Sequence, residues 1–545
     1  MSVLGEALST AERGEALWLG DLREKMGEEP SALPLLVRLR LPFGGERDYR
    51  VPLIPPETEA EEELLRDYLR ANLFNMLSAC SAGLVELFLP EKAPEKLRTL
   101  AEDAGKGLSA PGYCKTLRVS GRLCAAAGQE PLAFRLLPAA AYTSRPQEEK
   151  RGAAPLAPRL RSLAAMGQKG LRCGLDVGGT DIKLVIARDG RLLLTEEYDW
   201  DPSRFRKAEE LKGPILDFLR RGLARVCPGE GARPDSLGLS FPDVVIRDRI
   251  LGGETPKTRG MREHDPEGYE EQLRSVSRLK EELEAVCRPG TAVRVLNDGS
   301  MAAFTAAMEL ACAGEDGAIA EGVFAHSLGT DLGSGWLRAD GSVPELPLEL
   351  YDLLIDLGSG PQASLPAEDL RSTRNENSGL PGARRYLGQA AAFRLAWELE
   401  PELLAGYAEE SDGLLRIKSG PEDLRKPCLE HLMRRAEEGD AAACEIFRRI
   451  GEHLGQISRE IQVLLSPETE RRFLFGRFVR HPRCFALLRE GCGRVMPALK
   501  LFPADGELAR SPLMRELAAR GEGYVARFGQ AVGALYYAME REEQP

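Results

Sequence analysis

The chain has 545 residues, with 73 basic and 85 acidic side chains and a formal net charge of −12. This acidic balance argues against nucleic acid or an anionic membrane surface as the main partner, because both attract basic proteins. The N-terminus lacks a basic segment followed by an apolar core, and no apolar run is long enough to span a bilayer. We therefore expect a cytoplasmic protein with no membrane partner, built from about two to four domains.

Cysteine and histidine usage adds to this expectation. The eleven cysteines are scattered without a CxxC pair, which is typical of reduced thiols in a cytosol. The five histidines show no metal-binding spacing, which argues against a zinc site.

The first block, residues 1–137, is predicted to be an N-terminal α+β domain. Residues 33–53 alternate like two strands around a Gly-Gly turn, and residues 57–80 have apolar residues at helical spacing after an acidic first turn. The block carries no chemical motif, so its role, including any protein partner, stays open. Residues 138–169 are rich in Pro, Ala, Gly and Arg, which predicts a linker with a short helix.

The next block, residues 170–318, alternates between strand and helix patterns. Strands are expected at 171–177, 182–187, 191–198, 236–241 and 292–298, and helices at 205–226, 269–287 and 299–312. The last block, residues 319–545, starts with another strand pattern.

One strand–turn–strand pattern occurs twice in the chain. Gly179-Thr180-Asp181 is followed by a strand and an Asp-Gly turn, and Gly329-Thr330-Asp331 is followed by the same, 150 residues later. Such a repeat predicts two related lobes that face each other.

The glycine turns are candidates for phosphate binding. The P-loop pattern GxxxxGK[ST] is absent, and a dinucleotide fingerprint needs a helix where this chain continues as a strand after Gly179. The remaining interpretation is a hairpin whose tip turns its backbone N–H groups toward a phosphate. Two such hairpins on two lobes would hold a nucleotide's phosphates from both sides.

Several segments resemble the ROK-family sugar kinases and, more distantly, the hexokinases. "DVGGTDIKLVI", "LSFPDVV", "VLNDGSMAAF", "HSLGTDLGSG", "RRFLFGRFV" and the final "GQAVGALYYAMEREE" occur in that family's order. The resemblance covers residues 170–545. It implies an α/β fold of two ribonuclease-H-like lobes around a nucleotide cleft, with the last segment as the closing helix, preceded here by the separate N-terminal domain.

The resemblance also implies an activity, ATP-dependent phosphoryl transfer to a sugar hydroxyl, with ATP and Mg²⁺ as cofactors. Asp298 matches the catalytic base, and Asp176 the residue that orients Mg²⁺ through water. The implied phosphate and nucleotide residues are Gly178, Gly179, Thr180, Gly329, Thr330, Gly333 and Gly476. The implied sugar or polyol residues are Asn297, Glu254, Thr258, Arg259 and Glu349, with Lys257 in the same loop.

The chain departs from the family after the second hairpin. The family carries Glu-x-Gly-His and a CxCGxxGC zinc site, whereas this chain has "PELPLELYDLLIDLG". Zinc is therefore not expected, and the specific sugar and catalytic competence stay open.

Four alternatives also stay open. Asn297 and Asp298 before Gly-Ser are typical of a helix N-cap. Ser327 in "AHSLG" is similar to the nucleophile elbow of serine hydrolases, with His431, His453 and His481 as available partners. The same fold would also serve an ATPase or a non-catalytic sugar or nucleotide sensor. A homodimer is neither indicated nor excluded.

Overall fold

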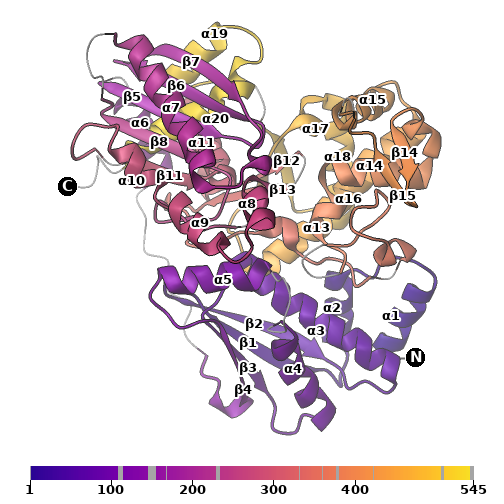
Figure 1. Cartoon of the computed structure of the whole chain (residues 1–545). Coiled ribbons are helices and arrows are strands. Elements are labelled where there is room, and N and C mark those ends of the chain that lie inside the picture. The colour runs from indigo at the N-terminus through magenta and orange to yellow at the C-terminus, as the bar shows by residue number, and fades with distance from the viewer. Residues whose placement is uncertain are drawn as a thin grey trace.

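The structure is a computed structural model of the chain (Figure 1). It describes residues 2–108, 115–144, 155–166, 169–228, 233–253, 255–291, 293–329, 332–358, 360–375, 380–420, 423–504 and 509–540. Of the predicted site residues, Glu254 and Thr330 lie outside the described residues.

The N-terminal block contains a four-stranded sheet of order β2-β1-β3-β4 with helices beside it. The predicted hairpin and helix are confirmed as β1, β2 and α3, and Thr58 caps α3 through a capping box with Glu61. The elements are α1 (Val3–Glu12), α2 (Leu19–Glu28), β1 (Leu33–Arg40), β2 (Glu46–Leu53), α3 (Glu59–Cys80), β3 (Leu84–Leu89), α4 (Glu95–Leu108), α5 (Lys115–Ala126) and β4 (Ala133–Pro138). The segment expected to be a linker contains α6 (Leu156–Met166), which packs on α11.

The first lobe is built on a five-stranded sheet of order β11-β8-β5-β6-β7. The central strand β5 pairs antiparallel with β6 and parallel with β8, while β7 and β11 extend the two sides. The elements are β5 (Leu171–Val177), β6 (Asp181–Arg188), β7 (Arg191–Asp199), α7 (Ala208–Val226), β8 (Ser236–Phe241), the small hairpin β9 (Val245–Ile246) and β10 (Arg249–Ile250), α8 (Arg259–His264), α9 (Tyr269–Val276), α10 (Leu279–Glu284), β11 (Val293–Asn297), α11 (Asp298–Ala313) and α12 (Asp316–Ile319).

The second lobe repeats this topology with one strand fewer. Its sheet has the order β13-β12-β16-β17, and β12 pairs antiparallel with β13 and parallel with β16. Its elements are β12 (Val323–Leu328), β13 (Leu332–Leu337), α13 (Ala383–Tyr386), α14 (Gly388–Leu399), β14 (Ala408–Ser411), β15 (Leu414–Ile417), α15 (Arg425–Glu437), α16 (Ala441–Leu465), β16 (Arg471–Phe475), α17 (Arg477–Arg480), α18 (Pro482–Val495) and β17 (Lys500–Pro503). Two helices follow it in sequence, α19 (Pro512–Ala519) and α20 (Tyr524–Tyr537). In the ribonuclease-H-like arrangement, a strand pairs with an antiparallel hairpin partner on one side and with parallel strands on the other. Both lobes have this arrangement, so their predicted fold class is confirmed.

Three predicted elements differ in detail. The charged helix expected at 269–287 is split into α9 and α10, and the strand expected to include Asp298 ends at Asn297. The closing helix α20 follows the second lobe in sequence but packs on β5 and β8 of the first lobe. Its backbone lies so close that a Cβ on Gly174 would be 1.9 Å from the carbonyl oxygen of Ala531.

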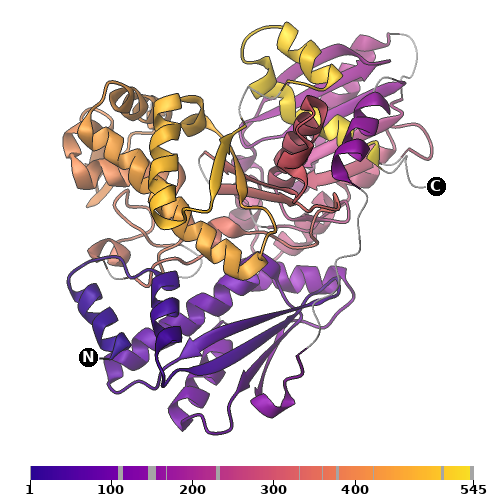
Figure 2. The ribbon, with the colours of Figure 1, turned by 180° about the vertical axis from the view of Figure 1, so that it is seen from behind.

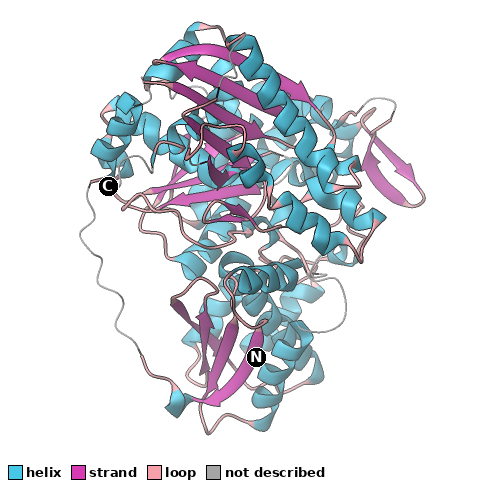
Figure 3. Cartoon of the chain, turned by 60° about the vertical axis from the view of Figure 1, so that its left-hand side comes forward, coloured by secondary structure: helices cyan, strands magenta, loops and turns pink. Residues whose placement is uncertain are grey.

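The N-terminal block lies against both lobes, as Figures 1 and 2 show from opposite sides. Figure 3 shows its sheet below the sheets of the lobes. Buried residues of this block and of the second lobe form one continuous hydrophobic cluster, which includes Leu69, Leu77, Leu354 and Leu464. The structure therefore does not confirm a separate N-terminal domain. None of the helices in the described ranges combines the length and the apolarity that crossing a membrane requires.

Candidate active site

The tip of the first hairpin joins β5 to β6 and exposes its backbone. The N–H of Gly178 donates to the carbonyl oxygen of Asp181 at 2.7 Å, which closes the turn. A Cβ at Gly178 would lie 2.8 Å from Oδ1 and 3.0 Å from the carbonyl oxygen of Asp181, so any larger residue there would push against the turn. Gly179 and Thr180 are exposed, and the Thr180 hydroxyl donates to Oδ2 of Asp181 at 3.3 Å.

The second hairpin joins β12 to β13 and has neighbours on two sides. Gly333 pairs with Ser327 in the ladder, and the carbonyl oxygen of Gly329 accepts from the N–H of Gln389 at 3.1 Å, at the start of α14. Gly476 follows β16 with a φ of 109°, and a Cβ there would lie 2.2 Å from the carbonyl oxygen of Leu328. The predicted glycines Gly329 and Gly476 are therefore adjacent.

Asp298 is the first residue of α11, directly after β11. Asn297 caps this helix, because its Oδ1 accepts from the N–H groups of Gly299 and Ser300 at 2.9 and 3.3 Å. Its Nδ2 donates to the carbonyl oxygen of Asp243 at 2.9 Å. The capping alternative is thus correct for Asn297. Both ends of its amide are engaged within the protein, so its role as a substrate ligand stays a prediction without support from this placement.

The start of α11 touches the second hairpin. A Cβ at Gly299 would lie 2.2 Å from the carbonyl oxygen of Ser334, and one at Gly335 would lie 2.0 Å from the carbonyl oxygen of Gly299. The two backbones can approach this closely only because both residues are glycine. Asp298 is therefore held beside β13 of the second lobe.

Asp176 and Asp298 lie near enough to influence each other's ionisation. Burial raises the pKa of Asp176 to about 6, Lys183 and the hydroxyl of Ser240 oppose the rise, and Asp298 adds to it. Burial also raises the pKa of Asp298, and Lys257 is the main group opposing that rise. Both aspartates are half-buried as residues.

Two residues at the site carry roles that sequence reasoning missed. Lys257 lies between the first hairpin and Asp298, with its Cε 3.8 Å from the position of a Cβ on Gly179. Gln530 of α20 donates to the carbonyl oxygen of Asp298 at 2.8 Å and to Oγ of Ser240 at 3.0 Å. The sequence placed Lys257 only in a loop of sugar contacts. No sequence signal marked Gln530, because its partners come from other elements.

The remaining predicted substrate residues have different surroundings. Thr258 is 1% exposed, and its hydroxyl is hydrogen-bonded to the hydroxyl of Tyr269 at 2.7 Å, so its side chain faces the core. Arg259 is exposed at the start of α8. Glu349 is buried beside Lys115 of the N-terminal block. These three roles stay predictions, and the placement of Thr258 does not support its own.

The nucleophile-elbow interpretation of Ser327 is wrong. An elbow needs a sharp strand-to-helix turn at the serine, whereas Ser327 lies inside β12 and a hairpin follows it. The neighbouring His326 is fully buried, with its Nδ1 2.9 Å from Oγ of Ser334, and burial lowers its pKa to about 3. A histidine so placed orders the strand pair rather than activating Ser327.

The described residues include no group of three or more His, Cys, Asp or Glu side chains arranged to hold a metal ion directly. An ion such as Mg²⁺, which keeps several of its waters, would need only one or two carboxylates together with phosphate oxygens. Asp176, half-buried at the end of β5 and close to the first hairpin, fits that requirement.

A comparison with solved structures matches the chain to ROK-family proteins, at low sequence identity. A ROK family glucokinase from Streptomyces griseus, solved with glucose and AMPPNP, is 19% identical over 68% of this chain and 100% of that one, with a TM-score of 0.41. The ROK hexokinase from Thermus thermophilus is 17% identical over 68% and 100%, with a TM-score of 0.41. A ROK family transcriptional regulator, a homolog of the E. coli MLC protein, is 16% identical over 68% and 81%, also with a TM-score of 0.41.

No family model matches the chain, and no curated protein matches it. Similarity of this size to kinases and to a regulator does not assign an activity.

Proposed function

We propose that this protein is an ATP-dependent phosphotransferase that moves the γ-phosphoryl group to a hydroxyl of a sugar or related polyol. One observation carries the proposal: Asp298 lies close both to Asp176, in β5 of the first hairpin, and to β13, the second strand of the second hairpin. Phosphoryl transfer depends on positioning and charge stabilisation. Asp298 would accept the proton of the hydroxyl, and the glycine-rich backbone of the two hairpins would bind the phosphates.

The phosphate groups lie between the hairpin tips in this proposal. The N–H groups around Gly179 and Gly329 donate to phosphate oxygens, and the Nζ group of Lys257 neutralises part of their charge. Mg²⁺, when bound, would offset the negative charge that develops on the phosphate oxygens. Asp176 would hold it through water.

Asp298 serves as the general base. Its carboxylate accepts the proton of the attacking hydroxyl while the γ-phosphoryl group leaves the nucleotide. Gln530 and the cap formed by Asn297 fix the backbone that carries this carboxylate. A base fixed in this way is already oriented when the acceptor arrives, which lowers the entropic part of the barrier.

The first test is turnover by the purified full chain with Mg·ATP and glucose, mannose or N-acetylmannosamine. Formation of sugar phosphate together with ADP supports the proposal. Phosphate release without an acceptor identifies an ATPase instead. A rise in melting temperature with a sugar but no turnover identifies a sensor, because a ligand of the folded state raises its stability.

The second test removes the base. We expect Asp298→Asn to lower kcat about 10³-fold, because general-base catalysis contributes about 10²–10⁴, while the affinity for AMPPNP changes less than about threefold. Asp217→Asn, the same change on the exposed face of α7, is the matched control. Retained transfer in Asp298→Asn would remove the base assignment. Loss of activity in Ser327→Ala at unchanged stability would return the hydrolase to consideration.

A further inference from the structure

We propose that the N-terminal block completes the acceptor site, with Lys115 positioning Glu349 beside Asp243 so that the two carboxylates receive hydrogen bonds from an uncharged polyol. This inference rests on the proposed function and assigns part of its site to a segment that has no place in the resemblance to sugar kinases. Lys115 is a positioning residue here, because it acts through Glu349.

Helix α5 of the N-terminal block reaches both lobes. At its start Lys115 forms ion pairs with Glu349 and Asp352 of the second lobe, the latter at 3.2 Å. Further along, Nη1 of Arg122 donates to the carbonyl oxygen of Gly252 at 2.8 Å, and Nε donates to Glu270 at 3.0 Å, both in the first lobe. Figure 1 shows α5 on the side of the N-terminal block that faces the lobes.

The same helix is fixed to its own block and to the first lobe. Thr116 is hydrogen-bonded to Ser78 at 3.1 Å, and Ser120 accepts from Ser81 at 2.9 Å. Leu123 belongs to a small apolar cluster with Val244 of the first lobe. These contacts place α5 rigidly, so the position of the Lys115 ammonium is determined by the fold.

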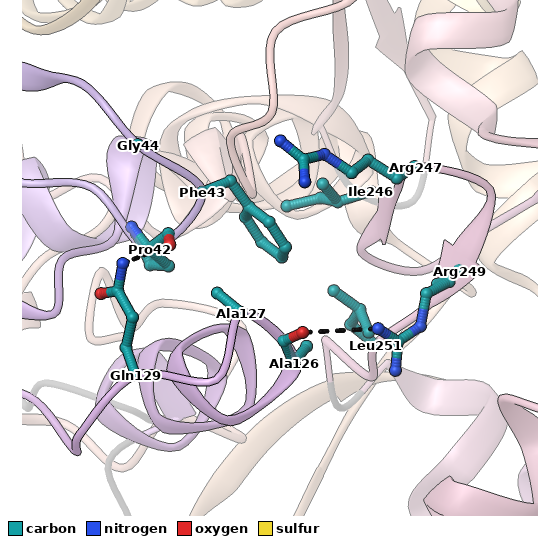
Figure 4. A pocket seen from close by; sticks show the side chains of 10 residues that line it. All are labelled: Pro42, Phe43, Gly44, Ala126, Ala127, Gln129, Ile246, Arg247, Arg249 and Leu251. Carbon is teal, nitrogen blue, oxygen red and sulfur yellow. Dashed lines mark hydrogen bonds between the residues drawn. The ribbon is translucent and has the colours of Figure 1, made fainter.

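The end of α5 lies beside a cavity of about 410 Å³ between the N-terminal block and the β9–β10 hairpin (Figure 4). Phe43 points into this cavity, and Arg249 donates to the carbonyl oxygen of Ala126 at 3.4 Å across it. The first lobe therefore contacts the C-terminal end of α5, while the second lobe holds its N-terminal end.

A short series of contacts connects Lys115 to Asp298. Oε1 of Glu349 lies 3.3 Å from the position of a Cβ on Gly253, and the N–H of Gly253 donates to Oδ1 of Asp243. The carbonyl oxygen of Asp243 accepts from Asn297, which caps the helix that Asp298 begins. Glu349 and Asp243 are thus connected through Asn297 to the proposed base, and we place the acceptor between these carboxyl groups.

Asp243 supplies the observation that points to a ligand. It is 2% exposed, and its Oδ2 has no hydrogen-bond partner among the described residues. A buried carboxylate oxygen without a donor is costly, and a ligand hydroxyl would provide that donor. The four acidic groups here, Asp243, Glu349, Asp352 and Asp298, outnumber the cationic groups Arg122, Lys115 and Lys257, so a phosphorylated or acidic sugar is disfavoured.

The ionisation of Glu349 depends on its neighbours. Burial raises its pKa to about 7, Asp352 and Asp243 add to the rise, and Lys115 opposes it; Tyr351 also donates to Oε2 at 2.8 Å. The Lys115 ammonium lies 4.1 Å from the centre of the Tyr351 ring. Removing Lys115 raises the pKa of Glu349 further, so a larger fraction of this carboxyl is protonated at neutral pH. A protonated carboxyl presents an O–H donor and has fewer sites that accept hydrogen bonds.

The experiment measures KM for glucose and mannose in Lys115→Met, Glu349→Gln and the double variant, from about pH 6 to about pH 9. We expect Lys115→Met to raise the sugar KM about tenfold near neutral pH and to recover toward about pH 9, as one unit of pKa corresponds to about tenfold. The KM for Mg·ATP should change less than twofold. Lys96→Met, on the exposed face of α4, is the matched control.

The double variant keeps the inference testable if Lys115→Met fails to fold, because it removes both charges. If Lys115 acts through Glu349, the double variant has the same sugar KM as Glu349→Gln alone. A sugar KM in the double variant tenfold above that of Glu349→Gln would overturn the inference. So would an unchanged sugar KM in Glu349→Gln, or an equal rise in the KM for sugar and for Mg·ATP in Lys115→Met. Preference for glucuronate over glucose would overturn the assignment of an uncharged acceptor.

Failure of the proposed function is distinguishable from failure of this inference. If the wild type phosphorylates no sugar, the proposed function fails. The sugar-induced rise in melting temperature, compared between the wild type and Glu349→Gln, then still decides whether this cluster binds a polyol.

Discussion

At the scale of single residues, Asn297 and Asp298 show how a structural role and a chemical role share two positions. Asn297 caps α11, and this cap fixes Asp298 at the first turn of a 16-residue helix. The positive end of the helix dipole favours the ionised carboxylate, while burial favours the protonated form. Burial thus makes this carboxyl more basic than an ordinary aspartate, which suits a group that must accept a proton.

Gly179 provides a test of the first hairpin. Its φ lies outside the left-handed region, and an added Cβ would meet only Cε of Lys257 at 3.8 Å, an ordinary contact. We therefore expect Gly179→Ala to fold with unchanged stability but to bind AMPPNP about tenfold more weakly, because the methyl group keeps a phosphate from the exposed N–H groups. Calorimetric titration measures the affinity. Wild-type affinity would place the phosphates elsewhere.

At the scale of elements, the packing of α11 on β13 joins the two lobes at the proposed base. Gly299 and Gly335 allow backbone atoms of the two elements to touch. Similar glycine contacts hold α20 on β5 and β8 through Gly174 and Gly238. Helices held this closely place Asp298 and Gln530 without depending on flexible side chains.

Gly335→Ala tests this packing. A Cβ at position 335 would lie 2.0 Å from the carbonyl oxygen of Gly299, and neither backbone can move away without disturbing its own element. We expect a loss of about 3 kcal/mol or more in the free energy of unfolding. Gly121→Ala in α5, where a Cβ has open space, should instead stabilise by about 0.5–1 kcal/mol. Urea unfolding measures both, and equal stability of the two variants would contradict the packing argument.

At the scale of the whole molecule, the N-terminal block is part of one folded body with the second lobe. Their buried apolar residues form one cluster, and α2, α3 and α16 share a buried polar network. In it Arg23 binds Glu460 at 2.8 Å and Asn72 at 2.9 Å, and Glu460 is 1% exposed. Unfolding of the block would leave this charge and the neighbouring leucines uncovered.

Arg23→Met tests whether the N-terminal block and the second lobe unfold together. Removing the guanidinium leaves the Glu460 carboxylate buried and unpaired, which costs about 3 kcal/mol or more. We expect a lower melting temperature with a single transition that includes both the N-terminal block and the second lobe. Arg13→Met, which removes an exposed ion pair with Glu15, should leave the melting temperature unchanged. Two separate transitions in Arg23→Met would show that the block unfolds independently.

The sequence by itself determined the elements that depend on local chemistry. Short apolar runs separated by glycine turns predicted β5, β6 and β7, the Gly-Gly turn predicted the β1–β2 hairpin, and the 150-residue repeat predicted two lobes of one topology. Each strand or turn signal, including each copy of the repeat, is contained within a short segment, because periodicity and turn chemistry act between neighbours in the chain.

Only the tertiary structure decided which residues of the two lobes the N-terminal block contacts. Lys115 meets Glu349 across 234 residues, and Arg122 meets Glu270 across 148. Two contacts at the candidate active site also join residues far apart in the chain: Lys257 lies beside Gly179, and Gln530 donates to the carbonyl oxygen of Asp298. A single side chain that pairs across elements leaves no periodic trace in the sequence, since its partner is chosen by the packing of whole helices and sheets and not by its neighbours along the chain.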